Sequence, residues 1–371
     1  MNEGAEASVN RAVAVPESRT LVERIVGVFR LPYPLGSLVL AALIGPPGAM
    51  LVAYSQTLNL DSALSETVYL FTGNVPSSEG SLATAIIFLL FAYLLYAIRY
   101  MRSSVSRNEE NFSPLLADGT ESYRRAFGPT LRLLPPLVLS FLLVIAVIPS
   151  ALQGNSIFFT SPVAEVFFFV AFPVAFYIFS TFVWVYFSSI RGLHELGKKT
   201  LNLRPYIEDP MLGVRPLGSL SLSFALVYFA GLIILAVDII VNTSFPLIEG
   251  VIMAALICTG VAFFFLPLNT IHQKLVEVRR REMAALRIRF KETRESSEHI
   301  TPAGPNTSLS DLKETMTQLT NVLIFDVSKS EVNSIPAWPF DTTILSKFAV
   351  VLFSVTAIVI SRYVAIGLKI G

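Results

Sequence analysis

The chain has 371 residues, of which 53% are hydrophobic and 15% charged, with a formal net charge of +1 at pH 7. Soluble globular proteins carry about 25% charged residues, so this composition, with its mean hydropathy of +0.63, excludes a soluble enzyme and a disordered chain. The near-neutral net charge gives no reason to expect a nucleic-acid partner. We therefore expect an all-α, polytopic protein whose main partner is the lipid bilayer.

Seven apolar segments are long enough to cross a bilayer as helices, which takes about 20 residues. The expected spans are 35–54, 82–98, 133–152, 163–190, 217–241, 245–268 and 344–368. The first contains Gly45-Pro46-Pro47-Gly48 near its middle. Proline removes a backbone donor and clashes with the preceding turn, so this span must kink or break.

The basic residues predict the orientation of the chain. All of the 28 Lys and Arg residues except Arg362 and Lys369 lie before the first span, after the second, after the fourth or after the sixth. The alternate loops 55–81, 153–162 and 242–244 contain none. Because basic segments stay in the cytoplasm during insertion, the N-terminus is expected inside and the C-terminus outside. We therefore expect a multi-pass protein of the cytoplasmic (plasma) membrane.

The chain divides into four predicted parts. They are a cytoplasmic segment 1–34, spans one to six in 35–268, a cytoplasmic helical hairpin 269–343, and the seventh span with an outer C-terminus in 344–371. From 270 to about 299 there is no glycine or proline, so the sixth span should continue as a helix into the cytoplasm. A turn at 301–306 and a second amphipathic helix follow, and 335–340 breaks the chain at the membrane.

Apolar residues recur at helical spacing along both arms of this hairpin, and they form a candidate anchor face for a homo-oligomer. We expect the two helices to pack through these residues. They are Leu275, Met283 and Leu286 on the first arm and Met316, Leu319 and Leu323 on the second. Trp338 suits the membrane interface, and Asp341 is placed to cap the seventh span.

Four charged residues lie near the outer ends of spans four to seven. They are Glu165, Asp238, Glu249 and Arg362. Ionisable groups inside a membrane are costly and are a functional hypothesis by default, so one interpretation is an outer vestibule that selects ions. The alternative is that the side chains reach the headgroups, or that Arg362 forms a structural ion pair with one of the acids.

The sequence gives little indication of catalysis, cofactor binding or metal binding. No catalytic motif, phosphate loop or dinucleotide fingerprint appears, and His194, His272 and His299 do not have metal-ligand spacing. We expect no enzyme activity, no cofactor and no metal. Arg279, Arg280 and Arg281 follow the sixth span directly. They either contact anionic lipid or only set the topology.

Two resemblances bear on function. The segments 204–210 and 213–218, with Ile271-His272 and Trp338-Pro339-Phe340-Asp341, resemble a pattern in uncharacterised prokaryotic multi-pass proteins. The architecture resembles the insect odorant and gustatory receptor-like ion channels, which have seven spans, an internal N-terminus and a cytoplasmic helical anchor before the seventh span. The residues typical of that seventh helix are replaced here by Ser361-Arg362-Tyr363.

The channel resemblance implies a homo-oligomer in which the seventh span lines a pore. Our leading hypothesis places that pore beside the seventh span, around Ser354, Thr356, Ser361 and Arg362. Ligand-gated ion conduction is the corresponding activity. A secondary transporter is the first alternative, with its solute site at the broken helix around Gly45 and Gly48. The second alternative is a non-catalytic accessory membrane protein whose hairpin docks a cytoplasmic partner.

Overall fold

The computed structural model describes residues 19–44, 79–153, 162–203, 209, 211–241, 247–298 and 309–369. Within these ranges the regular structure is helical, apart from one isolated antiparallel bridge between Leu116 and Leu201. The α-helices are α1 (Leu21–Val28), α4 (Glu79–Phe112), α5 (Gly119–Phe127), α6 (Leu134–Gln153), α7 (Pro162–Lys198), α8 (Arg215–Val241), α9 (Leu247–Glu298), α10 (Leu309–Ser334) and α11 (Thr342–Lys369). Two short 3-10 helices, Ser113–Leu115 and Gly128–Leu131, flank α5.

Among the described residues, six helices are long and apolar enough to cross a membrane. A seventh span is added if α1 and the helix Tyr33–Ile44, which are bent by 92° to each other, count as one. The expectation of an all-α polytopic membrane protein is thus confirmed. The choice of seven spans, and their orientation, stay predictions.

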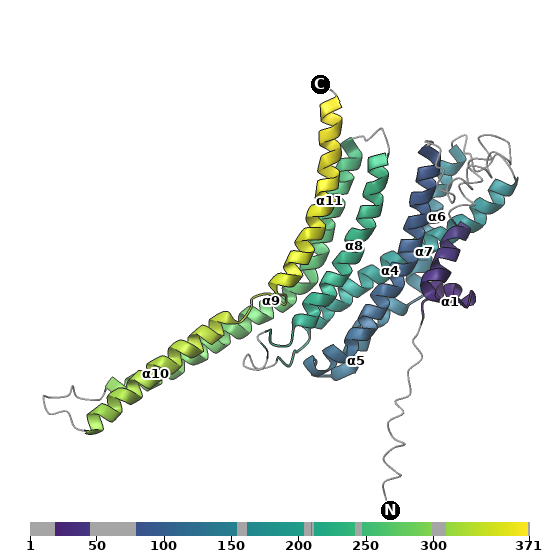
Figure 1. The fold of residues 1–371 in the computed structure, drawn as a ribbon. Helices are drawn as coiled ribbons and strands as arrows, with labels where there is room; N and C mark the ends of the chain where they lie inside the picture. The colour runs from purple at the N-terminus through teal and green to yellow at the C-terminus, as the bar shows by residue number, and fades with distance from the viewer. Residues whose placement is uncertain are drawn as a thin grey trace, which may run out of the picture.

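The spanning helices pack around α8. Helix α8 contacts α4, α9 and α11, while α7 contacts α4, α6 and α9. In Figure 1, α8, α9 and α11 form one group and α4, α6 and α7 another, and the groups diverge toward the end that carries the C-terminus. Stacked rings hold α9 to α11, since the centroids of Phe264 and Phe348 are 4.2 Å apart.

Close backbone approaches depend on glycine at particular positions. A Cβ atom added to Gly218 of α8 would lie 2.0 Å from the carbonyl oxygen of Pro339, and one added to Gly260 of α9 would lie 2.7 Å from the ring of Tyr228. Real Cβ atoms do not approach other atoms so closely, and overpacking of this kind is destabilising. Gly218 therefore lets the segment before α11 lie directly on α8.

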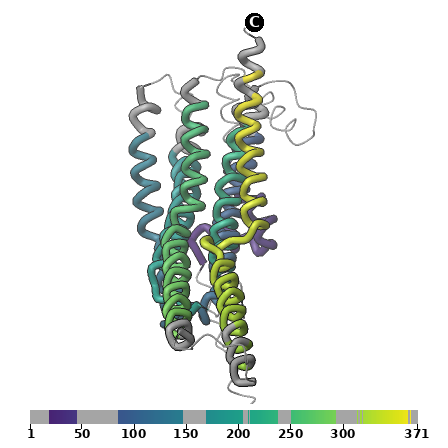
Figure 2. The backbone as a smooth tube through the Cα atoms, turned by 90° about the vertical axis from the view of Figure 1, so that its left-hand side faces the viewer, coloured from purple at the N-terminus to yellow at the C-terminus, as the bar shows by residue number. Residues whose placement is uncertain are grey.

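Both arms of the predicted hairpin are helical. Helix α9 runs without interruption for 52 residues, and Figures 1 and 2 show it leaving the bundle with α10 beside it in the opposite direction. Residues 335–341 separate α10 from α11, as expected. The Ile344 backbone N–H donates to Asp341 Oδ1 over 2.9 Å, which confirms the cap. The expected turn at 301–306 lies outside the described residues.

Helix α4 extends well beyond the second predicted span. The predicted span stops at residue 98, but the helix continues to Phe112, because the charged stretch that follows contains no glycine or proline. Tyr123 of α5 fastens this extension: its hydroxyl donates to the Val105 carbonyl oxygen over 2.7 Å, and its ring lies 5.4 Å from that of Phe112. The expected loop is therefore largely a helical extension with α5 packed against it.

Candidate functional site

The second arm of the hairpin exposes an apolar surface, which we call the α10 stripe: Met316, Leu319, Leu323 and Val327. These residues recur every three or four positions and therefore share one side of the helix. Met316, Leu319 and Leu323 are 60%, 57% and 58% exposed. The expectation that α10 packs on α9 through Met316, Leu319 and Leu323 is therefore wrong. Their role as an anchor between copies remains a prediction.

A different side of α10 contacts α9. The rings of Phe290 and Phe325 stack with centroids 4.0 Å apart, and Arg279 donates to the Asn333 side chain over 3.1 Å. Phe325 is half-buried, and it lies about half a helical turn from the α10 stripe. An amphipathic pattern shows that a helix has an apolar side, but it does not show which neighbour covers that side. Here the aromatic pair determines the contact.

The predicted anchor residues of α9 lie closer to the bundle. Leu275 is fully buried, while Met283 and Leu286 are half-buried. At the base of the hairpin, His272 Nδ1 lies 2.7 Å from the Ala337 carbonyl oxygen, and its ring stacks on Trp338 at 4.3 Å. Lys274 donates to the Lys199 carbonyl oxygen, and burial lowers the pKa of this lysine, with Glu277 acting in the opposite direction. The base of the hairpin is thus fixed to the bundle.

The candidate pore residues lie on α11. Ser354 and Ser361 are exposed on the side of α11 that points away from its own bundle, and Thr356 is half-buried. All three hydroxyls donate to carbonyl oxygens of their own helix over 2.7 to 2.8 Å. Such bonds let hydroxyl groups reside in an apolar environment at little cost. The arrangement fits a lipid-facing surface as well as a surface shared with other copies.

The four outer charges belong to four different helices. Glu165 is in α7, Asp238 in α8, Glu249 in α9 and Arg362 in α11, but their side chains lie outside the part of the structure that is described. The vestibule and the structural ion pair therefore both stay open. The break at Gly45 to Gly48, on which the transporter alternative rests, also lies outside the described residues.

The basic triplet after the sixth span is partly engaged within the protein. Arg279 bonds Asn333 of α10, and Arg281 pairs with Glu277 one turn away on the same helix. Glu277 and Arg281 are both well exposed, and an exposed pair of this kind contributes little stability. Two of the three arginines thus have partners in the hairpin, which leaves less of the triplet for lipid contact than the sequence suggests.

A cluster of tyrosines at the centre of the bundle was not predicted from the sequence. The Tyr93 hydroxyl donates to the Val227 carbonyl oxygen, and that of Tyr228 donates to the Leu256 carbonyl oxygen over 2.9 Å. Tyr186 lies 5.6 Å, between ring centroids, from Tyr228. The cluster ties α4, α7, α8 and α9 together. Only the spacing of aromatic residues hinted at it, and spacing does not show which rings meet.

An ion pair between distant segments, which lines a cavity between α1 and α4, was also not predicted. Glu23 of α1 pairs with Arg102 of α4, and the spacing of Thr20 and Glu23 before an apolar run is the one local signal for it. Among the described residues, no group of three or more His, Cys, Asp or Glu side chains is placed to hold a metal ion.

No family model, curated protein or solved structure matches the chain. The six or seven apolar helices found among the described residues define the class as a multi-pass membrane protein.

Proposed function

We propose that the protein is a homo-oligomeric channel or receptor of the cytoplasmic membrane, in which copies associate through the α10 stripe and α11 lines a shared pore. The observation that carries this proposal is the exposure of the stripe outside the spanning part of the chain. A row of large apolar side chains on a segment that lies in water marks a site of interaction with another molecule. A second copy is the partner that is always present at a matching concentration.

Two further features support this arrangement. Under the positive-inside rule the basic residues predict a cytoplasmic hairpin, which would put the stripe in water rather than in lipid. The outward side of α11 carries Ser354 and Ser361, which would give a shared axis some polar groups. The insect receptor-like channels, which the architecture resembles, have the same arrangement: their anchor lies outside the membrane and their seventh helix lines the pore.

The test is the oligomeric state of the purified protein, measured by light scattering in detergent. Leu319→Asp places a charge in the stripe, where burial against a second copy would cost several kcal/mol. We expect this variant to be a monomer while the wild type is a symmetric oligomer. Thr317→Asp adds the same charge to an exposed position of α10 outside the stripe, and it should leave the oligomer intact.

The same measurement distinguishes the alternatives. A wild-type protein that is monomeric would contradict the channel and favour the transporter or the accessory membrane protein. An oligomer that persists in Leu319→Asp would place the contact elsewhere. If the oligomer dissociates, reconstitution in liposomes should show ion flux in the wild type and none in the variant.

The orientation is tested by labelling with an impermeant thiol reagent. Because Cys258 is exposed, single cysteines are introduced in a Cys258→Ser background. Cysteines at Asn74 and Gln153 should react from outside intact cells, and those at Ser106 and Asn306 should react only after permeabilisation. Reaction of the Asn306 position from outside would overturn the orientation and place the hairpin on the other side of the membrane.

A further inference from the structure

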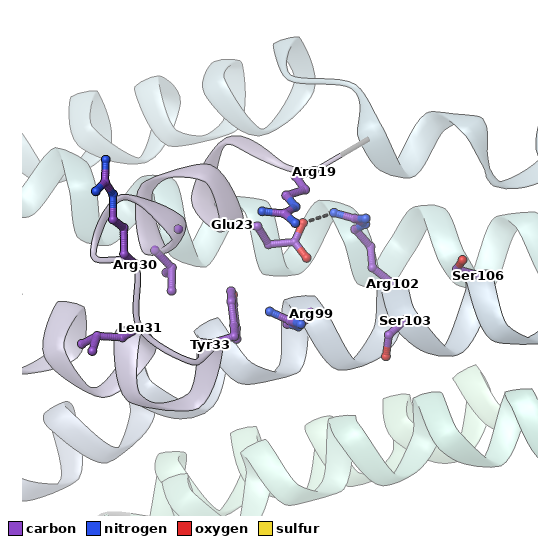
Figure 3. A pocket seen from close by; sticks show the side chains of 11 residues that line it. Arg19, Glu23, Arg30, Leu31, Tyr33, Arg99, Arg102, Ser103 and Ser106 are labelled. Carbon is purple, nitrogen blue, oxygen red and sulfur yellow. Dashed lines mark hydrogen bonds and ion pairs between the residues drawn. The ribbon is translucent and has the colours of Figure 1, made fainter. Parts of the chain in front are cut away.

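A cavity of about 410 Å³ lies between α1, the turn that follows it, and α4 (Figure 3). Its lining contains four arginines, Arg19, Arg30, Arg99 and Arg102, and a single acidic residue, Glu23. The lining contains no lysine. A concave site with this excess of guanidinium groups attracts an anion.

The one acidic side chain is fully engaged and does not neutralise the site. The Glu23 carboxylate accepts hydrogen bonds from the backbone N–H and the hydroxyl of Thr20, both over 2.9 Å, and it pairs with Arg102. The side chains of Arg102 and Glu23 are 13% and 8% exposed. This pair fixes α1 against α4, and it leaves the positive charge of the other arginines uncompensated by any acidic residue of the lining.

The remaining guanidinium groups are partly positioned in advance. Figure 3 shows Arg30 extending away from the Glu23 carboxylate. The Arg99 guanidinium carbon lies 4.4 Å from the centroid of the Tyr33 ring. The Tyr33 hydroxyl donates to the Leu95 carbonyl oxygen over 2.9 Å. Arg19 and Arg99 thus approach the cavity from two different elements, and their planar groups suit bidentate recognition of phosphate oxygens.

Helix α1 has the features of a helix that lies along a membrane surface. It is bent by 92° from the helix Tyr33–Ile44, which enters the bundle. Leu21, Ile25 and Val28 are exposed at three- and four-residue spacing, while Val22, Glu23 and Val26 are buried against the protein. Such a helix places its apolar side in the region between headgroups and acyl chains.

The level of α1 in the molecule agrees with this position. Figures 1 and 2 show α1 at about the height at which α10 gives way to α11. Trp338 lies in that connection, and tryptophan is enriched at the membrane interface. Leu31, which also lines the cavity, is exposed beside it. This is the level at which lipid phosphates are expected, with apolar side chains next to the cavity for the acyl chains.

We propose that this cavity binds a phosphate group through Arg19 and Arg99, and that the phosphate is the headgroup of an anionic lipid in the adjacent leaflet. Basic cavities at the cytoplasmic side of spanning helices suit such headgroups. The proposal differs from lipid contact at Arg279 to Arg281, because it concerns a concave site between two helices. It is independent of whether copies of the chain associate.

Native mass spectrometry of the full-length protein in detergent tests the proposal, with phosphatidylglycerol and phosphatidylcholine as probes. We expect the wild type to bind the first phosphatidylglycerol at least about tenfold more tightly than phosphatidylcholine. The variant R19Q/R99Q should lose this preference, because two charge-assisted contacts to phosphate are removed. Arg124 and Arg125 of α5 are exposed, so R124Q/R125Q removes the same charge elsewhere and should retain the preference within about twofold.

Inorganic phosphate distinguishes the two sources of the anion. Displacement of phosphatidylglycerol by millimolar phosphate, with phosphate binding that also requires Arg19 and Arg99, would support the site and assign it to a free phosphate. Equal binding of the two lipids by the wild type, with phosphate binding unchanged in R19Q/R99Q, would overturn the proposal. Melting without lipid checks that the variants fold. If R19Q/R99Q does not fold, R19Q alone repeats the comparison, since Arg19 precedes α1 and is exposed.

Discussion

Helices α8 and α10 use similar apolar residues but bury them to very different extents. In α8, Leu220, Phe224 and Phe229 are inaccessible because α4, α9 and α11 surround the helix. In α10, contact is confined to one side, and the α10 stripe remains exposed. Around α8 the chain supplies its own packing partners, while α10 offers a surface that the chain itself does not use. The bundle is where substitutions should affect folding, and the stripe is where they should affect association.

The largest effect is expected for Phe348→Ala in α11. Phe348 is 4% exposed and packs between Phe264 and Phe229, so truncation leaves a cavity that costs about 3 to 5 kcal/mol. Phe353→Ala on the same helix is the control, since Phe353 is 72% exposed and should change stability by less than about 0.5 kcal/mol. Unfolding by sodium dodecyl sulfate in detergent micelles measures both. Equal losses would mean that another copy covers the outward side of α11.

A smaller loss, about 1 to 3 kcal/mol, is expected for Gly218→Ala. The added methyl group would meet the Pro339 carbonyl oxygen and push the connection between α10 and α11 away from α8. Gly27→Ala in α1 is the matched control, because apart from its chain neighbours and its own helix backbone the nearest atom to the added Cβ belongs to the Arg19 side chain, 3.9 Å away. A thermal melt should show a lower midpoint for the first variant alone. An unchanged midpoint for Gly218→Ala would show that the connection moves aside without cost.

The smallest effect is expected for Leu323→Ala in the stripe, less than about 0.5 kcal/mol for the dissociated chain. In an oligomer held together by the stripe, the same substitution should cost about 2 kcal/mol or more, as for other buried leucines. Melting at a series of protein concentrations separates the two cases. A loss of stability that is small at every protein concentration would show that the stripe does not bind a second copy of the chain.

Local patterns were sufficient for much of the fold. The continuous helix after the sixth span, the break before α11 and the Asp341 cap follow from the spacing of apolar residues, from proline and from the carboxylate at a helix start. These features depend on neighbours in the sequence. Helix α4 ends 14 residues beyond the predicted span, because nothing in the charged segment after residue 98 interrupts a helix.

Contacts between segments far apart in the chain could not be predicted from the sequence. Glu23 and Arg102 are 79 positions apart, and of the two only Arg102 entered the topology prediction. Met316, Leu319 and Leu323 were correctly placed on one side of a helix, but periodicity does not specify whether that side meets α9. Phe290 and Phe325 determine the contact instead, and no local signal distinguishes them from other aromatic residues of the chain.

Helix α9 also has a mechanical consequence. His272 and Trp338 stack at the base of the hairpin, and Leu275 is a buried residue of α9 that lies just beyond them. The 23 residues of α9 after Leu275 extend for about 35 Å at 1.5 Å per residue. A rotation of about 10° at this base would therefore move the far end of the hairpin by about 6 Å, taking that helical length as a rigid arm. Small rearrangements between the spanning helices are thus converted into large displacements at the hairpin tip, and a force applied to the tip is multiplied at the pivot.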